Sequence, residues 1–123
     1  LGHGEGFMVC ARPSFASSAD QCEWLFDLAW VRMSGPFYES VAMACECEWD
    51  TEPSEIERDL MKLVVSRAHL RVFIYQQPNE AAAAEILTRM RAIVRTFAAA
   101  SDKDEYLVCA FDMSRGVFTF SRL

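Results

Sequence analysis

The feature that most constrains the fold of this chain is a continuous apolar segment, LRVFIYQ, from Leu70 to Gln76. Apolar runs of this length are typical of strands that are covered on both faces, as parallel strands are. Helical patterns flank the segment, so the order between Cys45 and Phe111 is strand, helix, strand, helix, strand. Parallel strands need crossover connections of this kind, and we therefore expect helices to cover the sheet.

Each of the two helical segments has a predicted start. In TEPSEIERDL, Ser54 is expected to cap the first helix, with Glu57 three residues later completing a capping box. The second helix is expected from about Glu80 to Ala99, and Asn79 is its predicted cap. Both helices carry an apolar stripe at the spacing of an amphipathic helix that packs on a sheet.

The remaining segments read as strands joined by turns. The first strand is predicted around Phe7 to Ala11, the second from Cys22 to Met33, and the third from Ser40 to Trp49, after turn residues at Ser34 to Pro36. Two strands follow the second helix, separated by the turn MSRG. The predicted order is βββ-α-β-α-ββ, a mixed-sheet α/β (mixed α+β) fold.

Composition favours one domain that spans residues 1–123. The chain is 52% hydrophobic and 24% charged, which is enough apolar material for one core. No apolar run approaches the roughly 20 residues that cross a bilayer, and LGHGEGFMVC lacks a signal-peptide pattern. Five cysteines, an odd number, read as reduced core residues, so we expect a cytoplasmic protein without a membrane partner. The abrupt start at Leu1 is compatible with a longer native chain that has an upstream segment.

Acidic residues on two neighbouring predicted strands are the candidate functional residues. Glu46 and Glu48 lie two apart on one strand, so they share a face about 6.5–7 Å apart and repel by roughly 2–3 kcal/mol. Asp27 is the single charge in the apolar run WLFDLAWV. A loop from roughly Met33 to Ser40 would place Asp27 beside Glu46. Three converging carboxylates would suit Mg²⁺, or Mn²⁺.

A simpler interpretation is a solvent-facing side of an antiparallel pair, on which alternating Glu is ordinary. That interpretation explains Glu46 and Glu48, and Asp27 would then need only an arginine partner. Two observations oppose it. Ala42 and Ala44 share the glutamate face and are not polar, and the strand leads directly into a crossover helix that should cover one side.

The segment from about Glu23 to Gln77 resembles the PD-(D/E)xK nuclease superfamily, which has the restriction-endonuclease-like fold. The resemblance rests on Asp27, on Glu46-Cys47-Glu48 on the next strand, and on the following helix and apolar strand, EIERDLMKLVVSRAHLRVFIYQ. Glu48 stands where the family has lysine, as in some restriction enzymes with Glu-x-Glu. In other members the lysine lies on the following helix, where this chain has Lys62, although a solvent-facing helix lysine is the simpler interpretation of that residue. The usual proline before the first acid is replaced by Phe26, and the family's N-terminal helix is missing.

The resemblance implies a metal-dependent phosphodiesterase that acts on nucleic acid. Asp27 and Glu46 would hold the ion, Glu48 would orient or deprotonate water or hold a second ion, and Lys62 would stabilise developing charge. A net charge of −6 opposes general attraction to nucleic acid. Arg32, Arg67 and Arg71 are the nearest basic residues in the sequence that could contact the phosphate backbone, although solubility alone also explains each of them.

Two alternatives remain open at this point. The first is a catalytically inactive member of the same fold that serves as a binding or assembly module, including a homodimer. Its motivation is the missing lysine and the aromatic residues Trp24, Phe26, Trp30 and Trp49, which are usually core but can form an interface. The second is a small domain whose acidic residues only face water.

Overall fold

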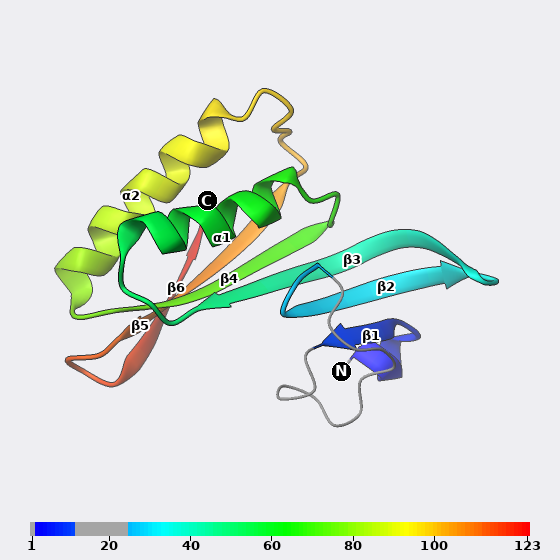
Figure 1. The fold of residues 1–123 in the computed structure, drawn as a ribbon, viewed down its shortest axis with the longest axis horizontal. Coiled ribbons are helices and arrows are strands. Elements are labelled where there is room, and N and C mark those ends of the chain that lie inside the picture. The colour runs from blue at the N-terminus through cyan, green and yellow to red at the C-terminus, as the bar shows by residue number, and fades with distance from the viewer. Residues whose placement is uncertain (1, 12–24) are drawn as a thin grey trace.

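The computed structural model describes residues 2–11 and 25–123 of the chain. These residues form one six-stranded sheet with two α-helices and a short 3-10 helix (Figure 1). The elements are η1 (Gly2–Glu5), β1 (Met8–Ala11), β2 (Leu28–Ser34), β3 (Phe37–Glu48), α1 (Pro53–Val65), β4 (Leu70–Gln77), α2 (Glu80–Thr96), β5 (Glu105–Asp112) and β6 (Val117–Arg122). The early part of the predicted second strand, with Cys22 and Trp24, lies outside the described residues.

The six strands lie in the sheet in chain order, from β1 at one edge to β6 at the other. Strands β1, β2 and β3 pair antiparallel, β3, β4 and β5 pair parallel, and β6 returns antiparallel to β5. The prediction of a mixed sheet with two crossover helices is confirmed.

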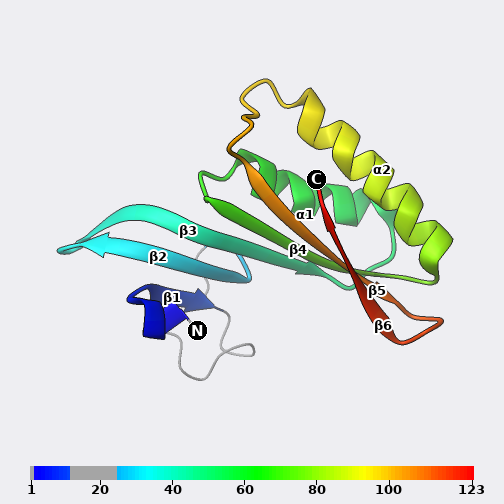
Figure 2. The ribbon, with the colours of Figure 1, turned by 180° about the vertical axis from the view of Figure 1, so that it is seen from behind.

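Both helices pack on the same face of the sheet (Figures 1 and 2). The two crossover connections, from β3 to β4 and from β4 to β5, run in the same direction across the sheet. Because such connections have the same handedness, both helices lie on one side of the sheet. In β4, Phe73 and Tyr75 are buried under the helices, whereas Val72 and Ile74 on the other face are only half-buried. The prediction that this strand is covered on both faces is therefore wrong for the described residues.

The two helix starts differ from each other in how well the sequence predicts them. Helix α1 begins at Pro53 with Glu52 as N-cap, and no side chain caps it. The predicted cap by Ser54 is wrong, because Pro53 already takes the first helical position, where its missing N–H costs nothing. The cap of α2 is confirmed, since Asn79 Oδ1 accepts a hydrogen bond from Ala82 N at 3.0 Å.

The β2–β3 hairpin closes more tightly than the sequence predicts. Ser34 pairs with Phe37 across a two-residue turn, in which Gly35 has a φ of +58°. The expected loop from Met33 to Ser40 is wrong because the strands continue pairing through those residues.

Two irregularities in this hairpin then shift the pairing. Glu39 and Ala42 of β3 have no residue opposite them on β2, so the register moves by one residue at each site. Leu28 is consequently opposite Cys45, and Asp27, just before β2, lies level with Glu46. Without the two bulges, the same turn would place Asp27 opposite Ala44.

Arg71, near the start of β4, contacts both the C-terminal end of α1 and the residue that precedes β5. Its side chain is buried, and it donates to Leu63 O at 3.0 Å and to Ser66 O at 2.9 Å. It also pairs with Asp104 at 3.0 Å. A buried positive charge is tolerated here because the guanidinium donates to two carbonyl oxygens and also pairs with a carboxylate.

Replacing Arg71 with methionine should therefore lower the free energy of unfolding by about 3–5 kcal/mol, because two carbonyls and a carboxylate lose their partner. Urea denaturation measures this, with Arg91→Met on the exposed side of α2 as the matched control. The control should change stability by no more than about 0.5 kcal/mol. Equal effects of the two substitutions would contradict the anchoring role.

Candidate active site

Asp27 is held at the edge of the hairpin by the backbone of β3. Its side chain is buried, and Oδ2 accepts a hydrogen bond from Cys47 N at 2.8 Å. The bond fixes the carboxylate beside the strand that carries Glu46. The structure thus brings together the two acidic residues that the sequence pattern places on neighbouring strands.

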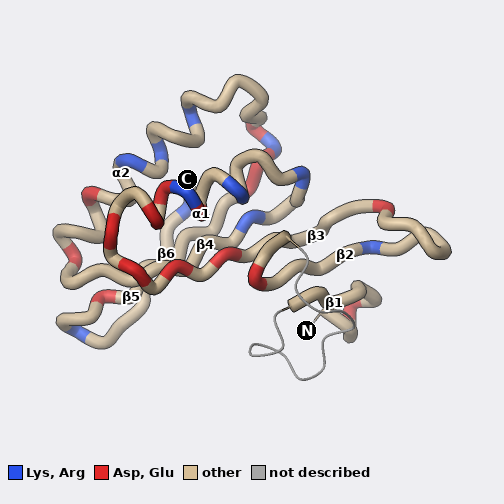
Figure 3. Tube along the Cα trace, viewed as in Figure 1, with Lys and Arg blue, Asp and Glu red and all other residues tan. Residues whose placement is uncertain are grey.

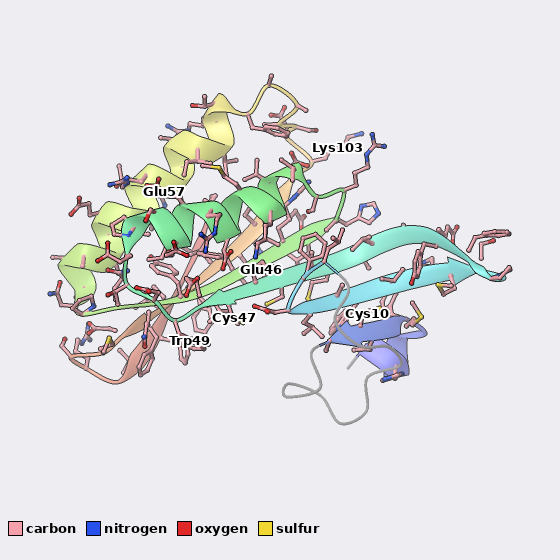
Figure 4. All side chains as sticks on the ribbon, viewed as in Figure 1. Cys10, Glu46, Cys47, Trp49, Glu57 and Lys103 are labelled. Carbon is pink, nitrogen blue, oxygen red and sulfur yellow. The ribbon has the colours of Figure 1, made fainter. Side chains whose placement is uncertain are left out.

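Glu46 is the most deeply buried acidic side chain of the site, with 2% of the residue exposed. It lies on the face of β3 that is covered by α1 (Figure 4). Its Oε2 accepts a hydrogen bond from Lys62 Nζ at 3.2 Å. Strand β3 and helix α1 therefore supply a contact between a buried carboxylate and an ammonium group that is 46% exposed.

Burial raises the pKa of Glu46 to about 7, because desolvation penalises the ionised carboxylate. The contact with Lys62 opposes this shift, whereas the negative charges of Asp27 and Asp59 add to it. Among the described residues, Glu46 thus has two acidic neighbours and one basic neighbour that affect its pKa. A carboxyl group with a pKa near 7 is poised to exchange its proton for a cation at neutral pH.

Asp59 joins the site although the sequence analysis does not identify it. Its Oδ1 lies 2.7 Å from Lys62 Nζ, one helical turn along α1. Partial burial alone would lower the pKa of Lys62, but the contacts with Asp59 and Glu46 outweigh it and raise the pKa. The signal that could have found Asp59 is its i,i+3 spacing from Lys62 on the helix.

Glu48 is on the same face as Glu46, but the structure does not bring its carboxylate to the others. Its Oε1 accepts a hydrogen bond from Asp50 N at 2.7 Å, at the end of β3. The cysteines that alternate with these acids, Cys45 and Cys47, project to the opposite face, and both are free thiols. Glu46 and Glu48 therefore share a face of β3, but it is Asp27 and not Glu48 whose charge acts on the pKa of Glu46.

The fit of this site to a divalent ion rests on its donors. Within residues 2–11 and 25–123, no group of three or more His, Cys, Asp or Glu side chains is arranged to hold a metal. Mg²⁺ commonly takes one or two carboxylates and keeps several waters, so Asp27 and Glu46 are a sufficient protein contribution. Their hard carboxylate oxygens are ligands of the kind that Mg²⁺ and Mn²⁺ prefer.

Comparison with known proteins gives no relative, since no family model, curated protein or solved structure matches the chain. Among the described residues, no helix is long and apolar enough to span a membrane. Inference about function therefore starts from the geometry of Asp27, Glu46, Asp59 and Lys62.

The raised pKa of Glu46 predicts a loss of stability as pH rises. The unfolded carboxyl releases its proton near pH 4.5 and the folded one near pH 7, so the folded state holds an extra proton between these values. The free energy of unfolding should fall across that window, by about 3 kcal/mol at most. Urea titrations at pH 5 and pH 8 measure the fall, and Glu46→Gln should remove it. The control Glu39→Gln, exposed on the same strand, should leave the fall intact; parallel losses in native protein and Glu46→Gln would contradict the assignment.

Proposed function

We propose that this chain is a metal-dependent phosphodiesterase that acts on nucleic acid, with a restriction-endonuclease-like fold. The single observation that carries the proposal is the buried carboxylate of Glu46 between Asp27 and Lys62. A buried acid with excess negative charge around it is costly for folding alone, and such sites are enriched in function.

The order of the elements supports the same proposal. One acid precedes β2, the second is on β3, and the lysine is on α1, which connects β3 to the parallel strand β4. The PD-(D/E)xK resemblance implies acids on two hairpin strands followed by a helix and an apolar strand. Lys62, rather than Glu48, occupies the position beside Glu46 that the resemblance assigns to a basic residue.

The proposed roles follow from the contacts of each side chain. Asp27 and Glu46 would hold a magnesium or manganese ion, which when bound would supply Lewis acidity to a phosphate and make a water molecule more acidic. Lys62 lies within reach of the same space and stabilises negative charge on the phosphate oxygens. Asp59 holds the Lys62 ammonium in position.

Glu48 is the proposed acceptor of the water proton. It is half-buried and lies two residues after Glu46 on the same face, and in this role it would release its hydrogen bond from Asp50 N. The water oxygen then bonds to phosphorus as its proton passes to the Glu48 carboxylate, the bond to the leaving oxygen breaks, and that oxygen takes a proton from a second water molecule.

A second candidate is an inactive member of this fold that acts through assembly. The observation in its favour is the second face of the sheet, where Phe118 and Phe120 of β6 are 47% and 67% exposed. Trp49 is also 47% exposed, whereas Phe26 is buried in the core. Such apolar exposure is typical of interfaces, including those of homodimers.

Metal binding and cleavage together test the proposal. Isothermal titration with Mn²⁺ should show one site in the native protein, and Asp27→Asn and Glu46→Gln should each weaken it by at least about tenfold, because each removes one ligand charge. Cleavage of plasmid DNA should fall with binding. The control Glu39→Gln should retain both properties.

The variant Lys62→Met separates metal binding from the stabilisation of negative charge on the phosphate. It should retain Mn²⁺ binding and lower the cleavage rate by about 10²–10³, the usual cost of removing one transition-state donor. Failure of the native protein to bind Mn²⁺ or to cleave DNA, combined with a concentration-dependent dimer in sedimentation, would favour the assembly alternative instead.

A further inference from the structure

Charged residues are segregated along the chain around α1. From Glu46 to Asp59 there are seven acidic residues and one basic residue, whereas from Leu60 to Arg71 there are none acidic and three basic. Figure 3 shows the acidic positions around the N-terminal end of α1 and basic positions around its C-terminal end. A chain with a net charge of −6 thus has a local positive region.

A cavity of about 520 Å³ lies in this positive region, at the C-terminal end of α1. Its basic lining residues are Arg67, His69, Arg71 and Lys103. The acidic lining residue, Asp104, is already paired with Arg71. Arg67 and Lys103 are exposed and make no ion pair with any residue that the structure describes. Two cations in the cavity are therefore available to an anion.

The cavity is larger than an isolated phosphate requires. Its volume lies in the range of about 300–1,000 Å³ that is usual for small-molecule sites. Val64 and Phe97 add apolar wall beside the cations. Aromatic rings in such grooves stack on nucleic-acid bases while cations contact the backbone. A nucleotide unit fits this combination better than a free inorganic anion.

The cavity and the candidate active site flank the C-terminal half of the same helix. Lys62 contacts Glu46, and Arg67 follows five residues later, just past the end of α1. Arg71 of the cavity is opposite Ala44, two residues before Glu46 on β3 and on the same face of the sheet. Figure 4 shows Glu46 beneath α1 and Lys103 beyond the C-terminal end of that helix.

We propose that this cavity binds a backbone phosphate of a nucleic-acid strand, through Arg67 and Lys103, and that the strand continues along α1 to the carboxylates. The path of the strand rests on the proposed function, whereas binding at the cavity needs no metal. The acidic end of α1 repels phosphate, so the bound strand approaches from the end that carries the cavity.

Binding without metal tests the proposal independently of cleavage. Fluorescence anisotropy of a labelled single-stranded DNA of about 20 nucleotides in EDTA compares the native protein with Arg67→Gln/Lys103→Gln. The double variant should bind at least about tenfold more weakly. Its slope of log Kd against log salt should fall by about 0.7, the contribution of one neutralised phosphate on a single strand.

Arg91→Gln removes an exposed positive charge from α2 and is the matched control. It should bind as the native protein does, and so should Glu46→Gln, which removes the proposed metal ligand without touching the cavity. Absence of cleavage by the native protein in Mg²⁺ or Mn²⁺, with salt-dependent DNA binding retained in EDTA, would therefore overturn the catalytic proposal and leave this one standing.

Two results would overturn the phosphate site. One is equal binding by Arg67→Gln/Lys103→Gln and Arg91→Gln. The other is selectivity for the free anion, seen when inorganic phosphate shifts the side-chain resonances of Arg67 and Lys103 while the oligonucleotide gives no change in anisotropy.

Discussion

The burial of the Glu46 carboxylate is the constraint on which the site depends. The residue is 2% exposed, faces one ammonium, and has two further acids near enough to raise its pKa. A fold that only needed a packed core would gain from an apolar residue here, because burying an acid costs free energy. The register of the hairpin sets Asp27 level with this carboxylate, and the position of α1 brings Lys62 into contact with it.

The sequence predicts those parts of the structure that local chemistry determines. Alternation on one strand is enough to place Glu46 and Glu48 on a common face, and Asn79 caps its helix as expected. Asp27 also lies level with Glu46 along the hairpin, as predicted, but for a different reason. The loop is two residues rather than Met33 to Ser40, and bulges at Glu39 and Ala42 restore the offset that the short turn removes.

The remaining features depend on side-chain torsions and tertiary packing, which periodicity does not encode. The carboxylate of Glu48 turns to Asp50 N, and no pattern in ACECEWD distinguishes that rotamer from one aimed at Glu46. The contact between Lys62 and Glu46 depends on the rotation of α1 over the sheet. The apolar composition of β4 predicts that both faces are covered, but the same composition is compatible with one buried face and one half-buried face, as the structure has it.

The titration of Glu46 itself tests the central claim most directly. Carbon-detected NMR of the Glu46 side-chain carboxyl follows its protonation across the pH range, with and without Mg²⁺. The account predicts a midpoint near 7 without the ion, and a midpoint lower by at least about one pH unit at saturating Mg²⁺, because a bound cation favours the ionised form. A midpoint near 4.5 that Mg²⁺ leaves unchanged would contradict it.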